Sequence, residues 1–388
     1  MLKNRQTKLR NKKKKKHKED KQRENIQTLP SRMRKSLADQ LKDPNDKTVF
    51  VLDGGQGTEL ENRGINVSNP VWSTVPFLDS SFWHSHNGLP NGCSKHTQRE
   101  NEKTQDRQIV EGMYHDFMDE GGCDVCMTIT YQSSFTSLKQ HTDIKTLKEY
   151  QDLMEKIVLF TREVIGEEKY LIGSIGCYGA HICSEFNGDY GSEPEKIDYY
   201  EYFKPQLDVF CFSEKLNKCN VIDMIGFETV PNLHEIKAIL SWGTDKINKP
   251  FYISLSVGND GKLRDGTDLA DICTLLKQLI SDKKLNPNFT MLGVNCVSSK
   301  QSLSMVANLH NNLQGLDVPL IVYPNSGEEY DPEEKIWLTR DQGDIASFSW
   351  DKYVPQFVKN NCRIIGGCCR TTPADIAKIR KATDLCTV

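Results

Sequence analysis

The segment RIIGGCCRTTPADI, residues 363–376, contains the pattern that decides the fold. Arg363–Cys369 begins as a short apolar run, which is typical of a strand buried on both faces of a parallel sheet. The Thr-Pro pair that follows is a typical helix start. Two adjacent cysteines, Cys368 and Cys369, lie between the two elements. The segment therefore predicts a strand, a loop with reactive side chains, and a helix.

The same order of elements recurs along the chain. Seven more runs have the length and composition of buried parallel strands: Val49–Gly55, Asp124–Tyr131, Tyr170–Gly176, Asp223–Thr229, Phe251–Val257, Met291–Cys296 and Leu320–Asn325. Helix-like segments lie between or after them: Lys145–Gly166, Pro231–Gly243, Asp268–Ser281, Ser298–Leu313 and Thr372–Thr383. Eight strands that alternate with helices predict an α/β protein with a single (β/α)8 barrel of the TIM type, and an open, doubly wound sheet is the alternative.

Most of the predicted strands end on a polar or reactive side chain. In a parallel barrel the carboxyl ends of all strands meet at one face, where the active site is built. The sequence therefore predicts one site that collects side chains from distant parts of the chain. The residues expected at this face are Asp53, Thr128, Thr130, Glu228, Cys296, Asn325, Cys368 and Cys369.

The cysteines at these strand ends form a candidate metal site. Side chains alternate in direction along a regular strand, so Cys368 and Cys369 can face one ion only where the strand breaks into a loop. Gly366 and Gly367 permit that break. With Cys296 as the third ligand, three thiolates suit Zn²⁺, and an open fourth position is the pattern of a catalytic zinc. The alternative is a chance pair of buried, inert thiols.

The segment DGGQGTEL, residues 53–60, is a second candidate for ligand binding. It looks like a dinucleotide-binding loop, but the third glycine of that motif is missing, which disfavours a nucleotide. Gly54 and Gly55 instead allow the backbone to approach a small ligand closely. Asp53 could hold the amino group of such a ligand.

The charge distribution divides the chain into a basic extension and an acidic body. Residues 1–47 contain 17 Lys/Arg and 6 Asp/Glu, although the whole chain has a net charge of −3. We expect this extension to be disordered and to be either a nuclear-localisation or nucleic-acid-binding segment or a solvated tail. Residues 48–388 form the predicted barrel, and the polar stretch 79–107 is interpreted as a surface insertion in its first loop.

Composition also limits the compartment and the partners. Thirteen cysteines without a secretory signal favour a reducing compartment. No apolar run approaches the roughly 18 residues that are needed to span a bilayer. We therefore expect a cytoplasmic protein without a membrane partner, with nuclear entry through the basic extension as a second possibility.

Taken together, these motifs resemble those of the homocysteine S-methyltransferase family. The resemblance extends from about Val49 to Ile379, and it is strongest with the fungal branch, which uses S-methylmethionine or S-adenosylmethionine as methyl donor. The pairing of GVNC with GGCC is its most specific feature. The motifs are VLDGGQGTELENRGI (51–65), NPVWST (69–74), TITYQSS (128–134), SIGCYGA (174–180), FETVPNLHEIKA (227–238), GVNC (293–296), YPNSGEEYD (323–331) and GGCCRTTPADI (366–376).

The resemblance implies a zinc enzyme. Carried over to this sequence, the zinc ligands are Cys296, Cys368 and Cys369. Tyr131 is the residue expected to occupy the open zinc position before the substrate arrives.

The resemblance also implies a binding site for homocysteine. Asp53 and Glu228 would bind its amino group, and Gly54 and Gly55 would line the amino-acid pocket. Thr128 and Tyr131 match further positions near the substrate.

The implied reaction is transfer of a methyl group from a sulfonium donor to the zinc-bound thiolate of homocysteine, which gives methionine. The segment after Cys369 is too short for the cobalamin and folate modules of larger relatives, which favours a free sulfonium donor. A hypothesis of a different class is a non-catalytic, zinc-containing barrel protein whose basic extension binds nucleic acid, although we consider a nucleic-acid partner the weaker alternative.

Overall fold

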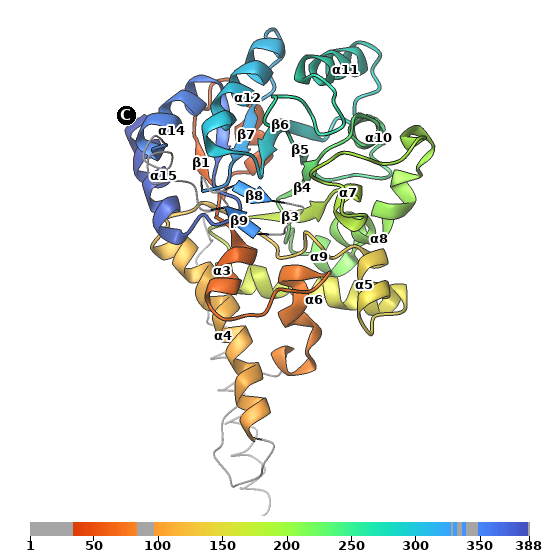
Figure 1. Cartoon of the computed structure of the whole chain (residues 1–388), viewed down its shortest axis with the longest axis vertical. Helices are drawn as coiled ribbons and strands as arrows, with labels where there is room; N and C mark the ends of the chain where they lie inside the picture. Colours follow the sequence, from red (N-terminus) through yellow and green to blue (C-terminus); the bar gives the residue numbers. More distant parts are fainter. Residues whose placement is uncertain (1–33, 84–96, 327–328, 332–335, 339–347, 387–388) are drawn as a thin grey trace, which may run out of the picture. The chain divides into compact units, whose positions relative to one another are not determined.

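The computed structural model describes residues 34–83, 97–326, 329–331, 336–338 and 348–386, with only the backbone described at 97–104, 329–331 and 336–338. The chain divides into two compact units, Met1–Lys35 and Ser36–Val388. The second unit contains the elements discussed below (Figure 1).

Eight parallel strands form the centre of this unit, in the order β1-β10-β7-β6-β5-β4-β3-β2. The two ends of that order also meet, because Leu52 beside β1 pairs in parallel with Val125 of β2 and the N–H of Asp53 donates to the carbonyl oxygen of Val125 at 3.0 Å. The sheet is therefore a barrel, which confirms the predicted fold and excludes the open sheet. The strands are β1 Phe50–Val51, β2 Val125–Met127, β3 Tyr170–Gly176, β4 Met224–Val230, β5 Phe251–Leu255, β6 Phe289–Asn295, β7 Leu320–Tyr323 and β10 Cys362–Ile365.

Alternating side chains of these strands face the barrel interior and the surrounding helices, as the pleat requires. The inward set forms its own apolar cluster, which includes Met127, Ile172, Met224, Tyr252, Met291, Ile321 and Ile364. The outward set, such as Ile225, Ile253, Val294 and Val322, joins the larger cluster between strands and helices. Both faces of every strand are thus buried, which explains why the strands read as continuous apolar runs.

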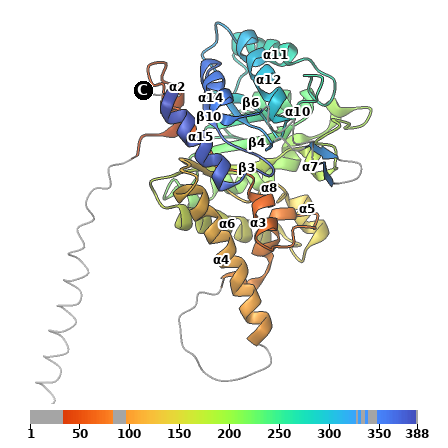
Figure 2. The same cartoon turned by 60° about the vertical axis from the view of Figure 1, so that its left-hand side comes forward.

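Helices surround the barrel (Figures 1 and 2). All five predicted helices are present, as α6 Leu147–Ile165, α10 Leu233–Ser241, α11 Leu269–Ser281, α12 Ser299–Asn312 and α15 Pro373–Cys386. Thr146 and Glu149 close the start of α6 with a reciprocal capping box. The other elements are α3 Gln56–Asn62, α4 Thr97–Asp119, α5 Phe135–His141, α7 Tyr178–His181, α8 Tyr199–Phe212, α9 Glu214–Asn217, α14 Trp350–Lys359, the 3₁₀ helices η1 Trp72–Leu78, η2 Ser80–Trp83 and η3 Pro194–Lys196, and a two-stranded antiparallel ribbon of β8 Glu329–Asp331 and β9 Ile336–Leu338.

The polar stretch 79–107 is only partly the loop that we predicted. Its last third is helical, because α4 begins at Thr97. Its first residues form η2, where Phe82 is 1% exposed and packs edge-on against Phe160 of α6. Residues 84–96 lie outside the described part of the chain.

Helix α2, Leu37–Lys42, corrects the predicted boundary of the extension at residue 47. Leu37 and Leu41 are 1% and 3% exposed, and they belong to the apolar cluster of the barrel interior. Gln40 Nε2 also donates to the hydroxyl of Tyr170 at the start of β3 (2.7 Å). The helix thus covers the amino ends of the strands, and the body of the protein begins before it.

Residues 1–33, which contain most of the basic extension, lie outside the described residues, so disorder and nuclear entry stay predictions. In the part of the chain that the structure describes, no helix has the length and apolar character needed to cross a membrane.

Candidate functional site

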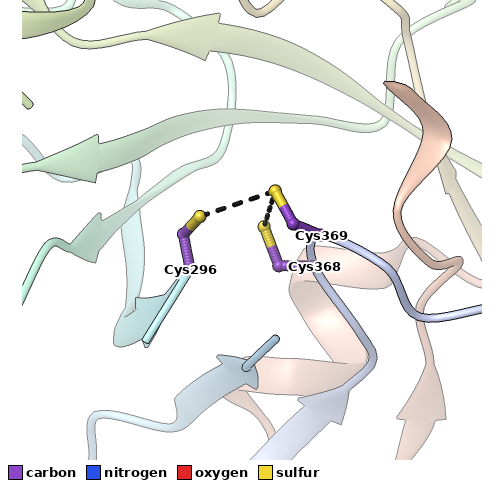
Figure 3. A group of neighbouring side chains, drawn as sticks. All are labelled: Cys296, Cys368 and Cys369. Carbon is purple, nitrogen blue, oxygen red and sulfur yellow. Dashed lines mark hydrogen bonds between the residues drawn. The ribbon is translucent and has the colours of Figure 1, made fainter. Parts of the chain in front are cut away.

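Three thiols from two loops meet at the carboxyl end of the barrel (Figure 3). Cys296 follows β6, and Cys368 and Cys369 follow β10. The Sγ atom of Cys369 lies 3.7 Å from that of Cys296 and 4.0 Å from that of Cys368. All three sulfur atoms lie within 4.8 Å of one another, and the side chains are partly exposed. The structure therefore brings together the three cysteines that the sequence analysis grouped, in a place that a ligand can reach.

The backbone of the two loops turns these side chains toward one another. Cys296 has a left-handed φ of +52°, a conformation that non-glycine residues rarely adopt. After β10, the N–H of Gly367 donates to the carbonyl oxygen of Asp53 (3.2 Å), and the N–H of Cys368 donates to that of Pro324 (2.8 Å). The loop after β10 is thus bonded to the loops after β1 and β7 on both sides, which fixes the direction of its cysteines.

The three thiols are electrostatically coupled. Hydrogen bonds from Cys296 and from Cys369 hold the pKa of Cys368 well below its usual value. Hydrogen bonds with Cys368 and with Cys369 hold the pKa of Cys296 well above it. One thiolate thus suppresses the ionisation of its neighbour, so three thiolates can coexist only around a cation. The sulfur donors fit a soft or borderline metal ion. Among the described residues, the group contains these three ligands and no fourth.

Asp53 follows β1 and is 1% exposed. Its Oδ2 atom accepts hydrogen bonds from Gln56 Nε2 (2.7 Å) and from the N–H of Met127 (3.0 Å). Burial raises the pKa of Asp53 to about 7, although these hydrogen bonds act in the opposite direction. A cationic group in contact with this buried carboxyl group would favour its ionised form.

Glu228 on β4 is the second buried carboxyl group of the site. Burial raises its pKa to about 8, and the charges of Cys368 and Asp53 add to this effect. Ser174 Oγ donates to Glu228 Oε1. The N–H of Ser174 in turn donates to Thr128 Oγ1 (2.9 Å). Thr128 therefore contacts Ser174 and positions Glu228 through it.

Tyr131 follows β2 on the side of the cysteines. Burial raises the pKa of its phenol, and the charges of Cys177, Glu185 and Cys296 raise it further. The structure thus places Tyr131 near the cysteine group and near a partly buried carboxyl group, that of Glu185.

Glycines allow the loop after β1 to pack closely against the loop after β10. A Cβ atom on Gly54 would lie 2.6 Å from the ring of Phe117, and one on Gly55 would lie 2.5 Å from the carbonyl oxygen of Cys368. The N–H of Gly55 donates to the carbonyl oxygen of Thr371 (3.0 Å). Any larger residue at these positions would displace the cysteine loop.

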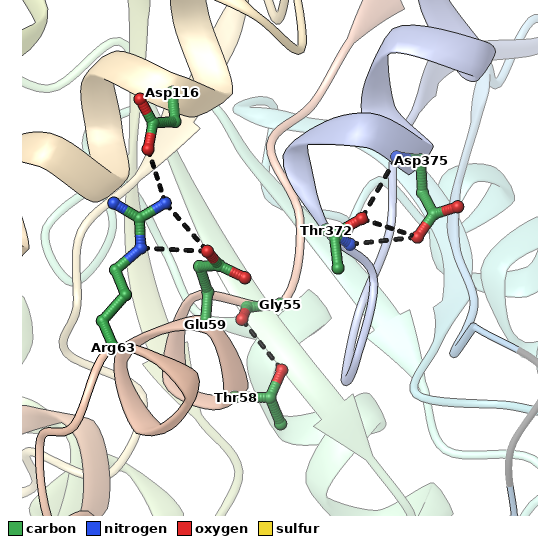
Figure 4. Close-up of polar contacts among 7 residues, drawn as sticks. All are labelled: Gly55, Thr58, Glu59, Arg63, Asp116, Thr372 and Asp375. Atoms are coloured by element: carbon green, nitrogen blue, oxygen red, sulfur yellow. Dashed lines mark hydrogen bonds and ion pairs between the residues drawn. The ribbon is translucent and has the colours of Figure 1, made fainter.

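Polar contacts hold the two helices that follow these loops (Figure 4). At the start of α3, Thr58 Oγ1 donates to the carbonyl oxygen of Gly55 (3.0 Å). Farther along α3, Arg63 bonds to Glu59 and, at 2.6 Å, to Asp116 of α4. At the start of α15, Thr372 and Asp375 cap the helix reciprocally. These contacts hold the first turns of α3 and α15 in place, and thereby the loops of the site that precede the two helices.

Sequence reasoning missed two residues that shape the site, Ser174 and Asn295. Asn295 Oδ1 accepts the N–H of Thr229 (2.9 Å), and its Nδ2 atom donates to Thr229 Oγ1 (2.9 Å). This holds Thr229, next to Glu228, at a strained φ of +58°. Both roles depend on a partner from another strand, so neither leaves a local pattern in the sequence, although Asn295 lies within the GVNC motif.

Comparisons with known proteins agree with this geometry. The homocysteine S-methyltransferase family model matches residues 50–383. Homocysteine S-methyltransferases 2 and 1 of Saccharomyces cerevisiae are 51% and 52% identical to the chain, over 87% of its length and 95% and 94% of theirs. The crystal structure of the metallated form of the homocysteine methyltransferase MmuM from Escherichia coli superposes with a TM-score of 0.61 at 25% identity, covering 86% of this chain and 96% of that one. The chain therefore belongs to the homocysteine S-methyltransferase family, whose fungal members it matches over most of their length, and it is a methyltransferase.

Proposed function

We propose that the enzyme transfers a methyl group from S-methylmethionine or S-adenosylmethionine to homocysteine, at a zinc ion held by Cys296, Cys368 and Cys369. The observation that carries the proposal is the grouping of three thiols on the barrel face that also holds two buried carboxyl groups, those of Asp53 and Glu228. The thiols could hold a metal ion that binds the sulfur of homocysteine, and the two carboxyl groups could bind its amino group.

The donor set supports zinc in particular. Thiolate ligands suit Zn²⁺, which has no redox chemistry of its own, and three protein ligands leave one position open. The E. coli relative was solved in a metallated form, which supports a metal at the matching place. When bound, zinc supplies the positive charge that keeps the three thiolates and an incoming substrate thiol ionised near neutral pH.

Asp53 and Glu228 orient homocysteine. Both carboxyl groups have a raised pKa without ligand, and an ammonium group in contact with them favours their ionised forms. Ser174, fixed by Thr128, holds the Glu228 carboxylate in place. Binding of the amino group at these residues leaves the sulfur end of the substrate directed to the cysteines.

In the reaction, a lone pair on the homocysteine sulfur forms the bond to the methyl carbon. The bond between that carbon and the donor sulfur breaks, and its electron pair stays on the donor. The donor sulfur is thereby neutralised, so the leaving group needs no general acid, and the proton of the homocysteine thiol is released to solvent.

The surroundings of Tyr131 support a cationic donor. Glu185 is partly buried there, burial raises its pKa, and its carboxyl group forms no ion pair with any residue that the structure describes. A sulfonium in this region would compensate the buried negative charge, and the tyrosine ring can contribute a cation–π contact.

A donor panel tests the proposal. The zinc-loaded protein is incubated with homocysteine and a CD₃-labelled donor, and labelled methionine is measured by mass spectrometry. S-methylmethionine or S-adenosylmethionine should give labelled methionine, whereas betaine and methyltetrahydrofolate should not. A chelator should abolish the transfer and added Zn²⁺ should restore it. No product from either sulfonium, or transfer that is insensitive to metal removal, contradicts the proposal.

A further inference from the structure

Arg264 lies in the loop between β5 and α11, at the same end of the barrel as the cysteines. Its N–H donates to the carbonyl oxygen of Ser256 (3.2 Å), which fixes its backbone. Its guanidinium lies over the ring of Phe186, 5.8 Å from the ring centre. The Nε atom is fully buried and has no hydrogen-bond partner among the described residues. A buried donor without a partner is unfavourable, which is a reason to expect a ligand there.

No carboxylate of the described part of the chain forms an ion pair with this guanidinium. Asp265, its neighbour in sequence, is already used, because its carboxylate accepts the N–H groups of Leu233 (2.7 Å) and Thr267 (2.9 Å). Burial lowers the pKa of Arg264, and the charges that counteract this effect are those of Cys296 and Asp260. The cation is thus partly desolvated, and a thiol of the proposed metal site, that of Cys296, is among the charges that act on it.

A cavity of about 470 Å³ adjoins Arg264, a volume within the usual range for small-molecule sites, roughly 300–1,000 Å³. Its wall comes from the loops after β3, β4 and β5, and includes Tyr190, Asn232 and His234 besides Arg264. The side chain of Asn232 is bonded to backbone groups of Gly188 and His234. The Tyr190 hydroxyl is also committed, because it donates to Glu235. The guanidinium, in contrast, is a charged donor of this wall that is available to a ligand.

We propose that Arg264 binds the α-carboxylate of the methyl donor, and that the cavity beside it is the donor subsite. This inference rests on the proposed function, because both sulfonium donors named above carry an amino-acid carboxylate. A guanidinium can donate two parallel hydrogen bonds to a carboxylate. The residue would then select amino-acid sulfonium compounds over sulfonium compounds without a carboxylate, and it would not discriminate between the two donors.

Homocysteine has a carboxylate as well, but the geometry favours the donor. The amino and carboxylate groups of homocysteine share one carbon atom, so its carboxylate must stay close to Asp53 and Glu228, which bind the amino group in the proposed function. The described residues that line the cavity beside Arg264 include neither Asp53 nor Glu228. A carboxylate bound in this cavity therefore fits the second substrate, the methyl donor, better than a homocysteine held at Asp53 and Glu228.

Steady-state kinetics with a matched pair of donors tests the proposal. S-methylmethionine is compared with its carboxamide in the parent protein, in Arg264→Gln and in Arg264→Lys. In Arg264→Gln, KM for S-methylmethionine should rise about 10- to 100-fold, as expected for loss of charge-assisted hydrogen bonds, and KM for homocysteine should change little. The preference of the parent for the acid over the amide should disappear. Arg264→Lys keeps the positive charge but cannot donate two parallel hydrogen bonds to a carboxylate. Its KM for S-methylmethionine should lie between those of the parent and Arg264→Gln.

Lys262→Gln is the matched control on the same loop, because the Lys262 side chain forms a surface ion pair with Asp268 (3.2 Å). It should behave as the parent. Circular dichroism and thermal unfolding of each variant establish that it is folded. If Arg264→Gln raises KM for homocysteine and leaves KM for the donor unchanged, or if the parent uses acid and amide equally well, the assignment is overturned.

Calorimetric titration of S-methylmethionine into the zinc-loaded protein separates this inference from the proposed function, because it needs no turnover. Binding to the parent that is lost in Arg264→Gln supports the carboxylate site even if no methionine forms. Equal binding to both proteins, or no binding to the parent, overturns the site.

Discussion

Cys368 supplies one of the three thiols of the proposed metal site. We expect Cys368→Ser to remain folded, since the side chain is partly exposed, but to lose bound zinc. Mutation of a residue that hydrogen-bonds to a metal ligand typically lowers activity about 10- to 100-fold. Loss of the ligand itself should reduce methyl transfer by more than this.

Metal analysis and circular dichroism of Cys368→Ser measure the two outcomes. Cys219→Ser, at an exposed cysteine, is the control and should keep both metal and activity. A Cys368→Ser protein that unfolds would indicate a structural metal site, and one that retains zinc would remove this cysteine from the ligand set.

Glu228 should make the unliganded protein less stable as the pH rises. Its folded pKa, raised by burial from 4.5 to about 8, exceeds the unfolded value, so the folded state binds the extra proton between these two pH values. The stability that this proton provides is complete below about pH 4.5 and is lost as the pH increases toward 8.

Thermal unfolding of Glu228→Gln at pH 6 and pH 9 measures this effect. Relative to the parent, the variant should gain stability at pH 9, and its affinity for homocysteine should fall. Glu61→Gln, at an exposed position on α3, should show neither effect. A stability difference that does not change with pH would contradict the raised pKa.

The candidate residues at strand ends could be predicted one by one because each follows an apolar run. The supporting residues could not. In the sequence, Ser174 is indistinguishable from other residues of a strand. Its role depends on the pairing of β3 with β4, which brings the Glu228 carboxyl group to the Ser174 hydroxyl. Arg264 likewise has no sequence signal, because its significance comes from burial without a partner.

At the scale of elements, the close contact between the loops after β1 and β10 transmits any change in one loop to the other. Gly55→Ala should reduce zinc affinity and raise KM for homocysteine about 10-fold or more, because its Cβ atom would meet the carbonyl oxygen of Cys368 at 2.5 Å and Thr58 Oγ1 at 2.7 Å.

Gly112→Ala in α4 is the matched control for Gly55→Ala. Its Cβ atom would meet only Arg63 Nη1, at an ordinary 3.5 Å, and alanine in a helix interior should stabilise the protein by up to about 1 kcal/mol. Zinc titration and thermal unfolding compare the two variants. Wild-type zinc affinity in Gly55→Ala would show that the loop contact does not support the site.

The elements that could be predicted are those whose sequence is patterned by the core. Strands buried on both faces and helices with one apolar face carry that pattern, as α6 and α11 do. The first half of α4 does not, because it extends beyond the barrel (Figure 2) and its sequence is almost entirely polar. We therefore interpreted part of a helix as a loop.

At the scale of the whole molecule, α2 decides where the barrel begins. Deletion of residues 1–33 should leave methyl transfer unchanged. Deletion of residues 1–47 also removes the buried Leu37 and Leu41, which should cost about 3–6 kcal/mol of stability. Thermal unfolding and activity of both proteins check this prediction, and equal stability would show that α2 is dispensable. Comparing the cellular location of the shorter deletion with that of the full chain tests nuclear entry.

The barrel itself could be predicted because strand and helix patterns alternate throughout the body of the chain. The role of α2 could not, because the basic composition of residues 1–47 dominates the local sequence. Three side chains of α2 are buried against the amino end of the barrel: Leu37, Ala38 and Leu41. Their burial can be recognised only when the closed barrel is known.

The central claim is that homocysteine sulfur completes a zinc site formed by Cys296, Cys368 and Cys369. X-ray absorption at the zinc edge of the holoenzyme, with and without selenohomocysteine, tests it most directly. Without substrate we expect three sulfur ligands at about 2.3 Å, together with one lighter ligand. With selenohomocysteine we expect a zinc–selenium distance to appear and the lighter ligand to disappear. Four sulfur ligands before substrate is added, or no selenium at the metal afterwards, would contradict the account.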